Sequence, residues 1–149
     1  MSKFSIQLPG YLELRKISFT TTKFPLFSEA VPCGFPSPAE SHIKKRLSIQ
    51  DIIKDKPSVF FLEAVGNSMI YCGIRTGTLL VCDKALNPKH NDIVLCTLNG
   101  KFMVKRFQHR ADGSTFLKSE TPSHPLIEIK EGDELLIEAV VTHAINEFI

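Results

Sequence analysis

Residues 92–107 read DIVLCTLNGKFMVKRF, and this stretch decides the fold. Two apolar runs flank Asn99-Gly100, and an Asn-Gly pair between such runs is the strongest short-range signal for a two-residue β-hairpin. The stretch therefore predicts two antiparallel strands, at 92–98 and 101–107. A hairpin of this kind needs further strands to bury its apolar face, so the rest of the chain must supply them.

Short strand patterns fill the remainder of the C-terminal part of the chain. Turn signals recur about every 8–12 residues, a spacing typical of a compact, mostly antiparallel β domain. Further strands are expected at 59–65, 78–82, 114–118, 126–129 and 135–144. No helix-turn-helix pattern precedes them, so direct sequence-specific DNA binding is not expected.

Proline sets apart the N-terminal region. Five of the nine prolines fall within residues 9–38. Proline lacks an amide donor and fixes φ, so this region is expected to form an extended arm with few regular elements. After it, Ser48 is expected to cap a short helical turn over 48–53, which ends before Pro57.

Length and composition fit one domain with an appendage. The chain has 149 residues, 43% of them hydrophobic, and a net charge of +2. That charge is too small to indicate a protein that coats nucleic acid, and the one basic cluster, Lys44-Lys45-Arg46, is expected to be a solvated face. No apolar run approaches the roughly 18 residues of a membrane span, and no signal peptide pattern opens the chain. An intracellular protein is therefore expected.

The cysteines and histidines do not form a metal-binding pattern. Cys33, Cys72, Cys82 and Cys96 match no common zinc spacing, and the five histidines are scattered. In a reducing compartment the cysteines are expected to be free thiols. Neither a metal site nor a cofactor is expected.

Ser68 and Lys105 are the candidate chemical pair. Ser68 follows Gly66-Asn67, where a tight turn is expected, and a helical turn starting near Ser68 would aim backbone amides at a developing oxyanion. Lys105 shares a strand face with Met103, an apolar setting that disfavours the charged form of the amine. A serine hydroxyl needs a base, and a neutral lysine can serve as one. Taken alone, each residue is more often a turn residue or a surface lysine.

Several motifs in fixed order resemble the UmuD/LexA family of self-cleaving Ser-Lys peptidases, most closely its UmuD-like members. The resemblance runs from Phe24 onward. It departs at Asn67, where those members have an acidic residue, and at Tyr71-Cys72, which replaces an acidic-Gly pair. The motifs that carry it are Phe24-Pro25-Leu26-Phe27-Ser28, Cys33-Gly34-Phe35-Pro36-Ser37-Pro38-Ala39, Gly66-Asn67-Ser68-Met69-Ile70, Gly77-Thr78-Leu79-Leu80, Asn91-Asp92-Ile93-Val94 and Val104-Lys105-Arg106.

The resemblance implies a fold and a set of roles. The fold is a compact peptidase domain of antiparallel strands with an extended N-terminal arm. Ser68 is then the nucleophile and Lys105 the general base, and the scissile bond joins Cys33 to Gly34. The backbone amides of Asn67 and Ser68 form the oxyanion hole.

The same resemblance divides the chain into three parts and gives each a purpose. Residues 1–33 are a removable arm and residues 34–57 a linker with a short helical turn. Residues 58–149 form the peptidase and dimerisation domain.

The resemblance also implies partners. Family members of the UmuD type are homodimers in the bacterial cytoplasm, and a RecA filament on single-stranded DNA promotes their self-cleavage in the SOS response. The trimmed product joins a UmuC-like Y-family polymerase for translesion synthesis. Alternatives are a phage or plasmid relative with another partner, and a non-catalytic subunit that regulates a polymerase. A leader-peptidase-like enzyme is disfavoured, because the chain shows no membrane anchor and carries an internal Cys-Gly site.

Overall fold

A computed structural model of the protein describes residues 22–27, 43–54 and 56–149. The chain divides into two units, Met1–Ile52 and Ile53–Ile149. Cys33 and Gly34, the predicted scissile residues, lie outside the described residues.

The described residues of the first unit form one strand pair and one helical turn. Strand β1 (Phe24–Phe27) pairs antiparallel with β2 (Ile43–Leu47), and α1 (Ile49–Ile52) follows. Ser48 caps the turn as expected: its Oγ accepts from the Asp51 amide at 3.2 Å, and the Asp51 carboxylate accepts from the Ser48 amide at 2.7 Å. The strand pair was not expected, because the proline count favoured an irregular arm and gave no sign of the pairing.

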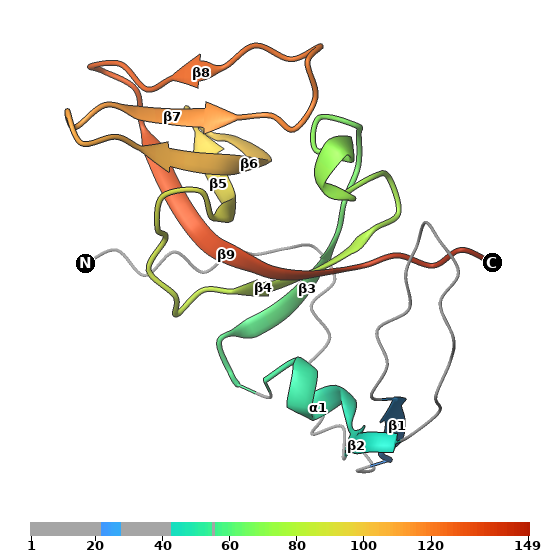
Figure 1. The fold of residues 1–149 in the computed structure, drawn as a ribbon. Helices are drawn as coiled ribbons and strands as arrows, with labels where there is room; N and C mark the ends of the chain where they lie inside the picture. Colours follow the sequence, from blue (N-terminus) through green and yellow to red (C-terminus); the bar gives the residue numbers. More distant parts are fainter. Residues whose placement is uncertain (1–21, 28–42, 55) are drawn as a thin grey trace. The chain divides into compact units, whose positions relative to one another are not determined.

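The second unit is a seven-stranded antiparallel sheet with the strand order β3-β4-β9-β5-β6-β7-β8. Figure 1 shows β9 as a long curved strand that joins the β3–β4 end of the sheet to the β5–β8 end. The mostly β fold expected from the sequence is confirmed. The strands are β3 (Val59–Glu63), β4 (Leu79–Asp83), β5 (Ile93–Leu98), β6 (Lys101–His109), β7 (Thr115–Lys118), β8 (Ile127–Glu128) and β9 (Leu135–Ile145).

The β5–β6 hairpin has the geometry that its turn residues require. Asn99 and Gly100 adopt φ values of 50° and 80°, the left-handed pair of a type I′ turn, and Leu98 lies opposite Lys101. Strand β6 is two residues longer than expected, because its last four residues also pair with β7. Strand β3 is two residues shorter than the expected 59–65.

Two apolar clusters form the core of this unit, and β5 contributes to both. Leu95 belongs to the first cluster with Met69 and Leu80. Val94 and Cys96, whose side chains alternate with that of Leu95, belong to the second cluster with Leu117. Since Met69 is only 3% exposed, the segment that carries Ser68 is anchored in the first cluster. Burying one such side chain stabilises a fold by roughly 1.5–3 kcal/mol.

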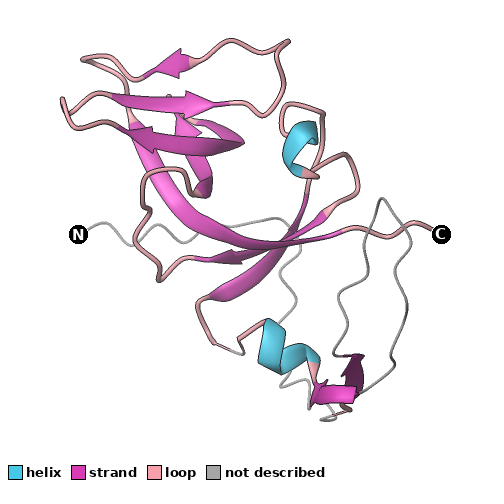
Figure 2. Ribbon diagram, viewed as in Figure 1, coloured by secondary structure: helices cyan, strands magenta, loops and turns pink. Residues whose placement is uncertain are grey.

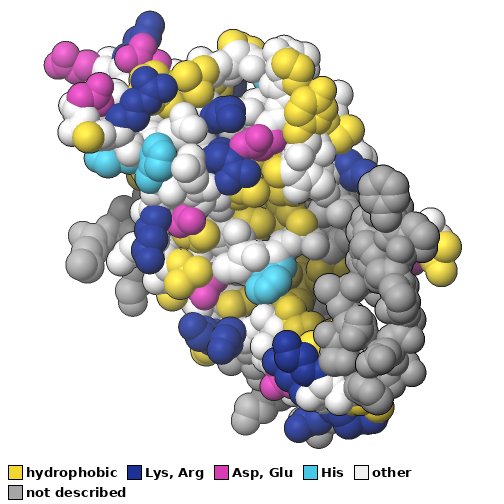
Figure 3. All heavy atoms as spheres, in the orientation of Figure 1, with side chains coloured by type: hydrophobic (Ala, Val, Ile, Leu, Met, Phe, Trp, Pro, Cys, Tyr) yellow, Lys and Arg dark blue, Asp and Glu magenta, His cyan; other side chains and the backbone are white. Residues whose placement is uncertain are grey.

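The outer surface and the helices add two observations. On the face drawn in Figure 3, positive and negative side chains are interspersed over the seven-stranded sheet. No helix within residues 22–27, 43–54 and 56–149 is long and apolar enough to cross a membrane.

Candidate active site

Ser68 and Lys105 come together in the second unit. The Lys105 Nζ donates a hydrogen bond to the Ser68 Oγ at 2.8 Å. The two residues are distant in the sequence and lie on different elements, a loop and strand β6. The sequence-based pairing of these residues therefore corresponds to a direct contact.

The Ser68 loop connects β3 to β4 and is shaped by short-range bonds. Gly66 takes a φ of 98°, which an L side chain rarely adopts, and its amide donates to the Thr76 Oγ1 at 2.9 Å. A 3₁₀ turn, η1 (Ile70–Cys72), follows and is drawn in cyan beside the strands in Figure 2. The helical turn expected near Ser68 is present, and it starts two residues later.

Lys105 is buried on β6, opposite Val94 in the β5–β6 register. Its side chain is 8% exposed, and this burial lowers the pKa of the Lys105 amine. A thiolate at Cys96 would oppose the effect, but burial raises the pKa of Cys96 to about 11, so the thiol is neutral near pH 7. Within the described residues no carboxylate lies within ion-pair distance of Lys105. Burial thus shifts Lys105 toward the neutral form that a lysine base requires.

Backbone amides beside the Ser68 hydroxyl can act as hydrogen-bond donors. Within the described part of the chain, the amides of Asn67 and Ser68 have no hydrogen-bond acceptor, although the amides of Gly66 and Ile70 on either side do. An oxygen atom placed next to the Ser68 Oγ could therefore accept from these two amides.

Two residues that sequence reasoning missed contact this site from β6 and from the end of β7. Arg106, the neighbour of Lys105, forms an ion pair with Glu120. The backbone of Glu120 bonds to the Ser68 loop at two points, at Ser68 and at Tyr71. The motif Val104-Lys105-Arg106 marked Arg106 as part of a pattern, but nothing in the sequence pointed to Glu120.

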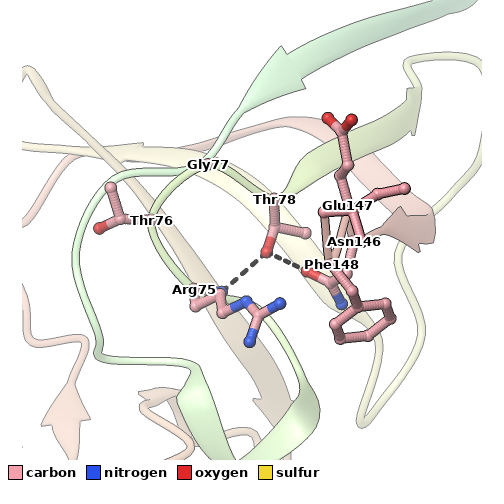
Figure 4. Close-up of a pocket in the computed structure, with 8 residues that line it drawn as sticks. Arg75, Thr76, Gly77, Thr78, Asn146, Glu147 and Phe148 are labelled. Atoms are coloured by element: carbon pink, nitrogen blue, oxygen red, sulfur yellow. Dashed lines mark hydrogen bonds between the residues drawn. The ribbon is translucent and has the colours of Figure 1, made fainter.

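A separate pocket of about 290 Å³ lies at the other end of the same loop. Figure 4 shows Thr78 within it, beside Asn146, with the Phe148 ring facing Arg75. Thr78 donates to the Asn146 Oδ1 at 2.6 Å, and the Asn146 side chain also donates to the Gly73 carbonyl at 3.0 Å. The pocket residues thus brace the loop after η1, and neither Ser68 nor Lys105 lines the pocket.

Metal ligands do not gather at either place. Among the residues that the structure describes, no three His, Cys, Asp or Glu side chains form a group that could hold a metal ion.

A serine hydroxyl in contact with a buried lysine amine, held by an antiparallel β scaffold, is an arrangement of the serine-peptidase class. The chain matches the Peptidase S24-like family over residues 25–142, and it belongs to that family. The resemblance to the UmuD/LexA family is thereby confirmed, and serine-peptidase self-cleavage is supported as the general activity of the chain.

The chain matches three curated relatives over most of its own length and most of theirs. Protein ImpA of Salmonella typhimurium is 36% identical over 123 residues, which are 82% of this chain and 83% of ImpA. Protein SamA of Salmonella typhimurium is 37% identical over 124 residues, 83% of this chain and 85% of SamA. Protein MucA of Escherichia coli is 32% identical over 125 residues, 83% of this chain and 84% of MucA. Together with the family match they support an SOS-related protein.

Proposed function

We propose that the protein cuts its own chain between Cys33 and Gly34, with Ser68 as the nucleophile and Lys105 as the general base. The observation that carries the proposal is the 2.8 Å hydrogen bond between the Lys105 Nζ and the Ser68 Oγ. A lysine in this contact serves as a base only when it is neutral, and burial lowers the pKa of Lys105 in that direction.

The reaction is an acyl transfer followed by hydrolysis. Neutral Lys105 takes the proton of the Ser68 hydroxyl, and the Oγ attacks the carbonyl carbon of Cys33. The bond to Gly34 breaks, and the Gly34 nitrogen receives the proton from the Lys105 ammonium. Residues 1–33 remain as an ester on Ser68. Water, deprotonated by Lys105, then hydrolyses the ester and frees the hydroxyl.

The amides of Asn67 and Ser68 form the oxyanion hole in this proposal. Their lack of acceptors within the described residues supports the role, because donors already fixed in place stabilise the tetrahedral oxyanion without reorganisation. Removal of one such donor typically lowers a turnover rate by about 10²–10³-fold.

The substrate segment belongs to the same chain, so tethering takes the place of substrate binding. We assign residues 1–33 to a removable arm, residues 34–57 to a linker and residues 58–149 to the peptidase and dimerisation domain. Cleavage then requires the arm to enter the site, and a partner that favours this minor state accelerates it.

The proposed partners rest on the resemblance to the family. We propose that the protein is a cytoplasmic homodimer, that a RecA filament on single-stranded DNA promotes its cleavage, and that the trimmed form joins a UmuC-like Y-family polymerase in translesion synthesis. Membership of the S24 family and similarity to ImpA, SamA and MucA support this reading.

The test is the intact mass of the purified protein, measured after incubation alone at alkaline pH. A second incubation adds RecA, single-stranded DNA and a slowly hydrolysed nucleotide. The expected product begins at Gly34 and is absent from Ser68→Ala and Lys105→Ala proteins. Lys101→Ala is the matched control, because Lys101 is an exposed lysine on the same face of β6. A chain that stays intact under both conditions points instead to a non-catalytic subunit.

The pH dependence of the cleavage rate gives a second readout. The rate should rise with pH as Lys105 loses its proton. Because burial lowers the pKa of Lys105, the midpoint should fall below the ordinary lysine value of about 10.4.

A further inference from the structure

Glu120 contacts both segments that carry the Ser68–Lys105 pair. Its backbone amide donates to the Ser68 carbonyl at 2.8 Å, and its own carbonyl accepts from the Tyr71 amide at 2.9 Å. These two bonds join the chain just after β7 to the loop on both sides of Met69. The loop is therefore hydrogen-bonded to the segment after β7 at Ser68 itself, the residue that carries the hydroxyl.

The Glu120 side chain continues the connection to β6. Its carboxylate accepts from the Arg106 Nε, and Arg106 is the immediate neighbour of Lys105. The same guanidinium donates from a second nitrogen to the Asn91 carbonyl at 2.6 Å, so it is held from two directions. The side chains of Arg106 and Glu120 are 25% and 18% exposed, which leaves the pair shielded from much of the solvent. Charge-assisted bonds of this kind are roughly twice as strong as neutral ones.

We propose that Glu120, acting through Arg106, is a positioning residue that holds the Ser68 hydroxyl against the Lys105 amine. The role rests on the proposed function, because it concerns the pair proposed there to cut the chain. Neither Glu120 nor Arg106 contacts the Ser68 or Lys105 side-chain atoms that react.

The Ser68 loop needs such a contact because it is less buried than the strand that carries Lys105. Lys105 is buried within the sheet. In the Ser68 loop Met69 is buried, but Asn67, Ile70 and Tyr71 around it are exposed. A loop shift of about 1 Å would lengthen the 2.8 Å contact beyond hydrogen-bond range. Misplacement on that scale can slow a reaction by about 10²-fold.

The proposed role of Glu120 is to hold the Ser68 loop in place, and not to change the pKa of Lys105. The Arg106–Glu120 pair carries no net charge, and the lowered pKa of Lys105 comes from burial. A Cys96 thiolate would act against it, but the pKa of Cys96 is raised to about 11, so the thiol is neutral near pH 7. Arg106→Lys keeps both charges of the pair, so it should lower the cleavage rate at every pH and leave the midpoint of the pH profile in place.

The test compares self-cleavage rates of the full chain across alkaline pH. Glu120→Gln, which keeps the backbone bonds and the shape, should lower the plateau rate about tenfold, the order expected for loss of one charge-assisted contact. Arg106→Lys, which keeps the charge but cannot reach Glu120 and Asn91 together, should have a similar effect. Combining the two substitutions should add little beyond the larger single effect, because both act through one contact. Glu128→Gln is the matched control: Glu128 is an exposed glutamate on β8 and should leave the rate unchanged.

A second measurement does not depend on cleavage. Hydrogen exchange of the Tyr71 and Glu120 amides should speed up in Glu120→Gln, while the melting temperature stays within about 2 °C of wild type. A wild-type rate in Glu120→Gln, a shifted midpoint with an unchanged plateau, or unchanged exchange of both amides would overturn the positioning role. Failure of the proposed function looks different, because wild type would then not cut at all or Ser68→Ala would still cut.

Discussion

Replacement of Lys105 by methionine should make the protein more stable while removing its proposed base. The comparison belongs in a Ser68→Ala background, where the chain should not cut itself and the serine hydroxyl is absent from both proteins. In that background the Lys105 amine has lost its hydrogen-bond partner. Lys105 is 8% exposed in the wild-type structure and lies opposite Val94 in the β5–β6 register.

The magnitude follows from this burial. A buried polar group without a partner costs about 1–3 kcal/mol, and more if it is charged. Methionine has a similar length and no charge, so Lys105→Met should raise the free energy of unfolding by at least about 1 kcal/mol at pH 7. A gain of 1 kcal/mol corresponds to about 2–4 °C in melting temperature for a chain of this size.

The pH dependence of this gain has a definite sign. Burial lowers the pKa of Lys105 in the folded protein, so below that pKa the amine is charged in both folded and unfolded states and the destabilisation is fully present. As pH rises toward about 10.4, the unfolded chain also loses the proton and the destabilisation disappears. The advantage of methionine should therefore be largest near neutrality and shrink above the lowered pKa.

The assay is urea unfolding at pH 7 and pH 10, with Lys101→Met as the control. Lys101 lies on the same strand and the same face but is exposed, so its replacement should change stability by less than about 0.5 kcal/mol at either pH. Two results would falsify the conclusion that the buried amine destabilises the fold. One is a Lys105→Met protein less stable than its parent at pH 7, and the other is an equal gain in the free energy of unfolding at both pH values.

Three further outcomes can be measured on the same material. Cys82 and Cys96, whose pKa values burial raises to about 11, should react with a thiol reagent at pH 8 only after unfolding. Cys72, which is partly exposed, should react before either of them in the folded protein. Gly100→Ala should destabilise the hairpin by about 1 kcal/mol in urea unfolding, because φ is 80° there and a Cβ atom meets no compensating contact. Asn146→Ala should lower the unfolding free energy by about 1–2 kcal/mol, because it removes two side-chain bonds that brace the loop after η1.

The parts of the fold that follow from local rules could be predicted. The Asn99-Gly100 pair strongly favours a two-residue type I′ turn, and this turn fixes the register of the hairpin. Both strands and the shared face of Lys105 and Met103 could therefore be predicted. The Ser48 cap followed in the same way from a side chain that bonds three residues ahead.

The parts that depend on distant pairing could not be predicted. Strand β1 pairs with a segment about twenty residues later, and no local signal fixes that register. The contacts of Glu120 could not be predicted for the same reason. Its backbone bonds to Ser68 and Tyr71 depend on where β7 ends relative to a loop far away in sequence. Backbone groups carry no side-chain signature, so such contacts become visible only in the folded chain.

The charges around the site fit the proposed role of Lys105 as a base. Arg106 and Glu120 are adjacent to the Ser68–Lys105 pair and neutralise each other, whereas among the described residues Lys105 has only the Ser68 hydroxyl as a side-chain hydrogen-bond partner. A carboxylate in place of that hydroxyl would favour the ammonium form and abolish the base. The ion pair lies one residue away from Lys105, so in the proposed positioning role it would fix geometry and leave the pKa of the amine to burial. Substitutions at Lys105 and at Glu120 should therefore differ: the first removes a destabilising buried group, and the second loosens the contact that holds the Ser68 loop near Lys105.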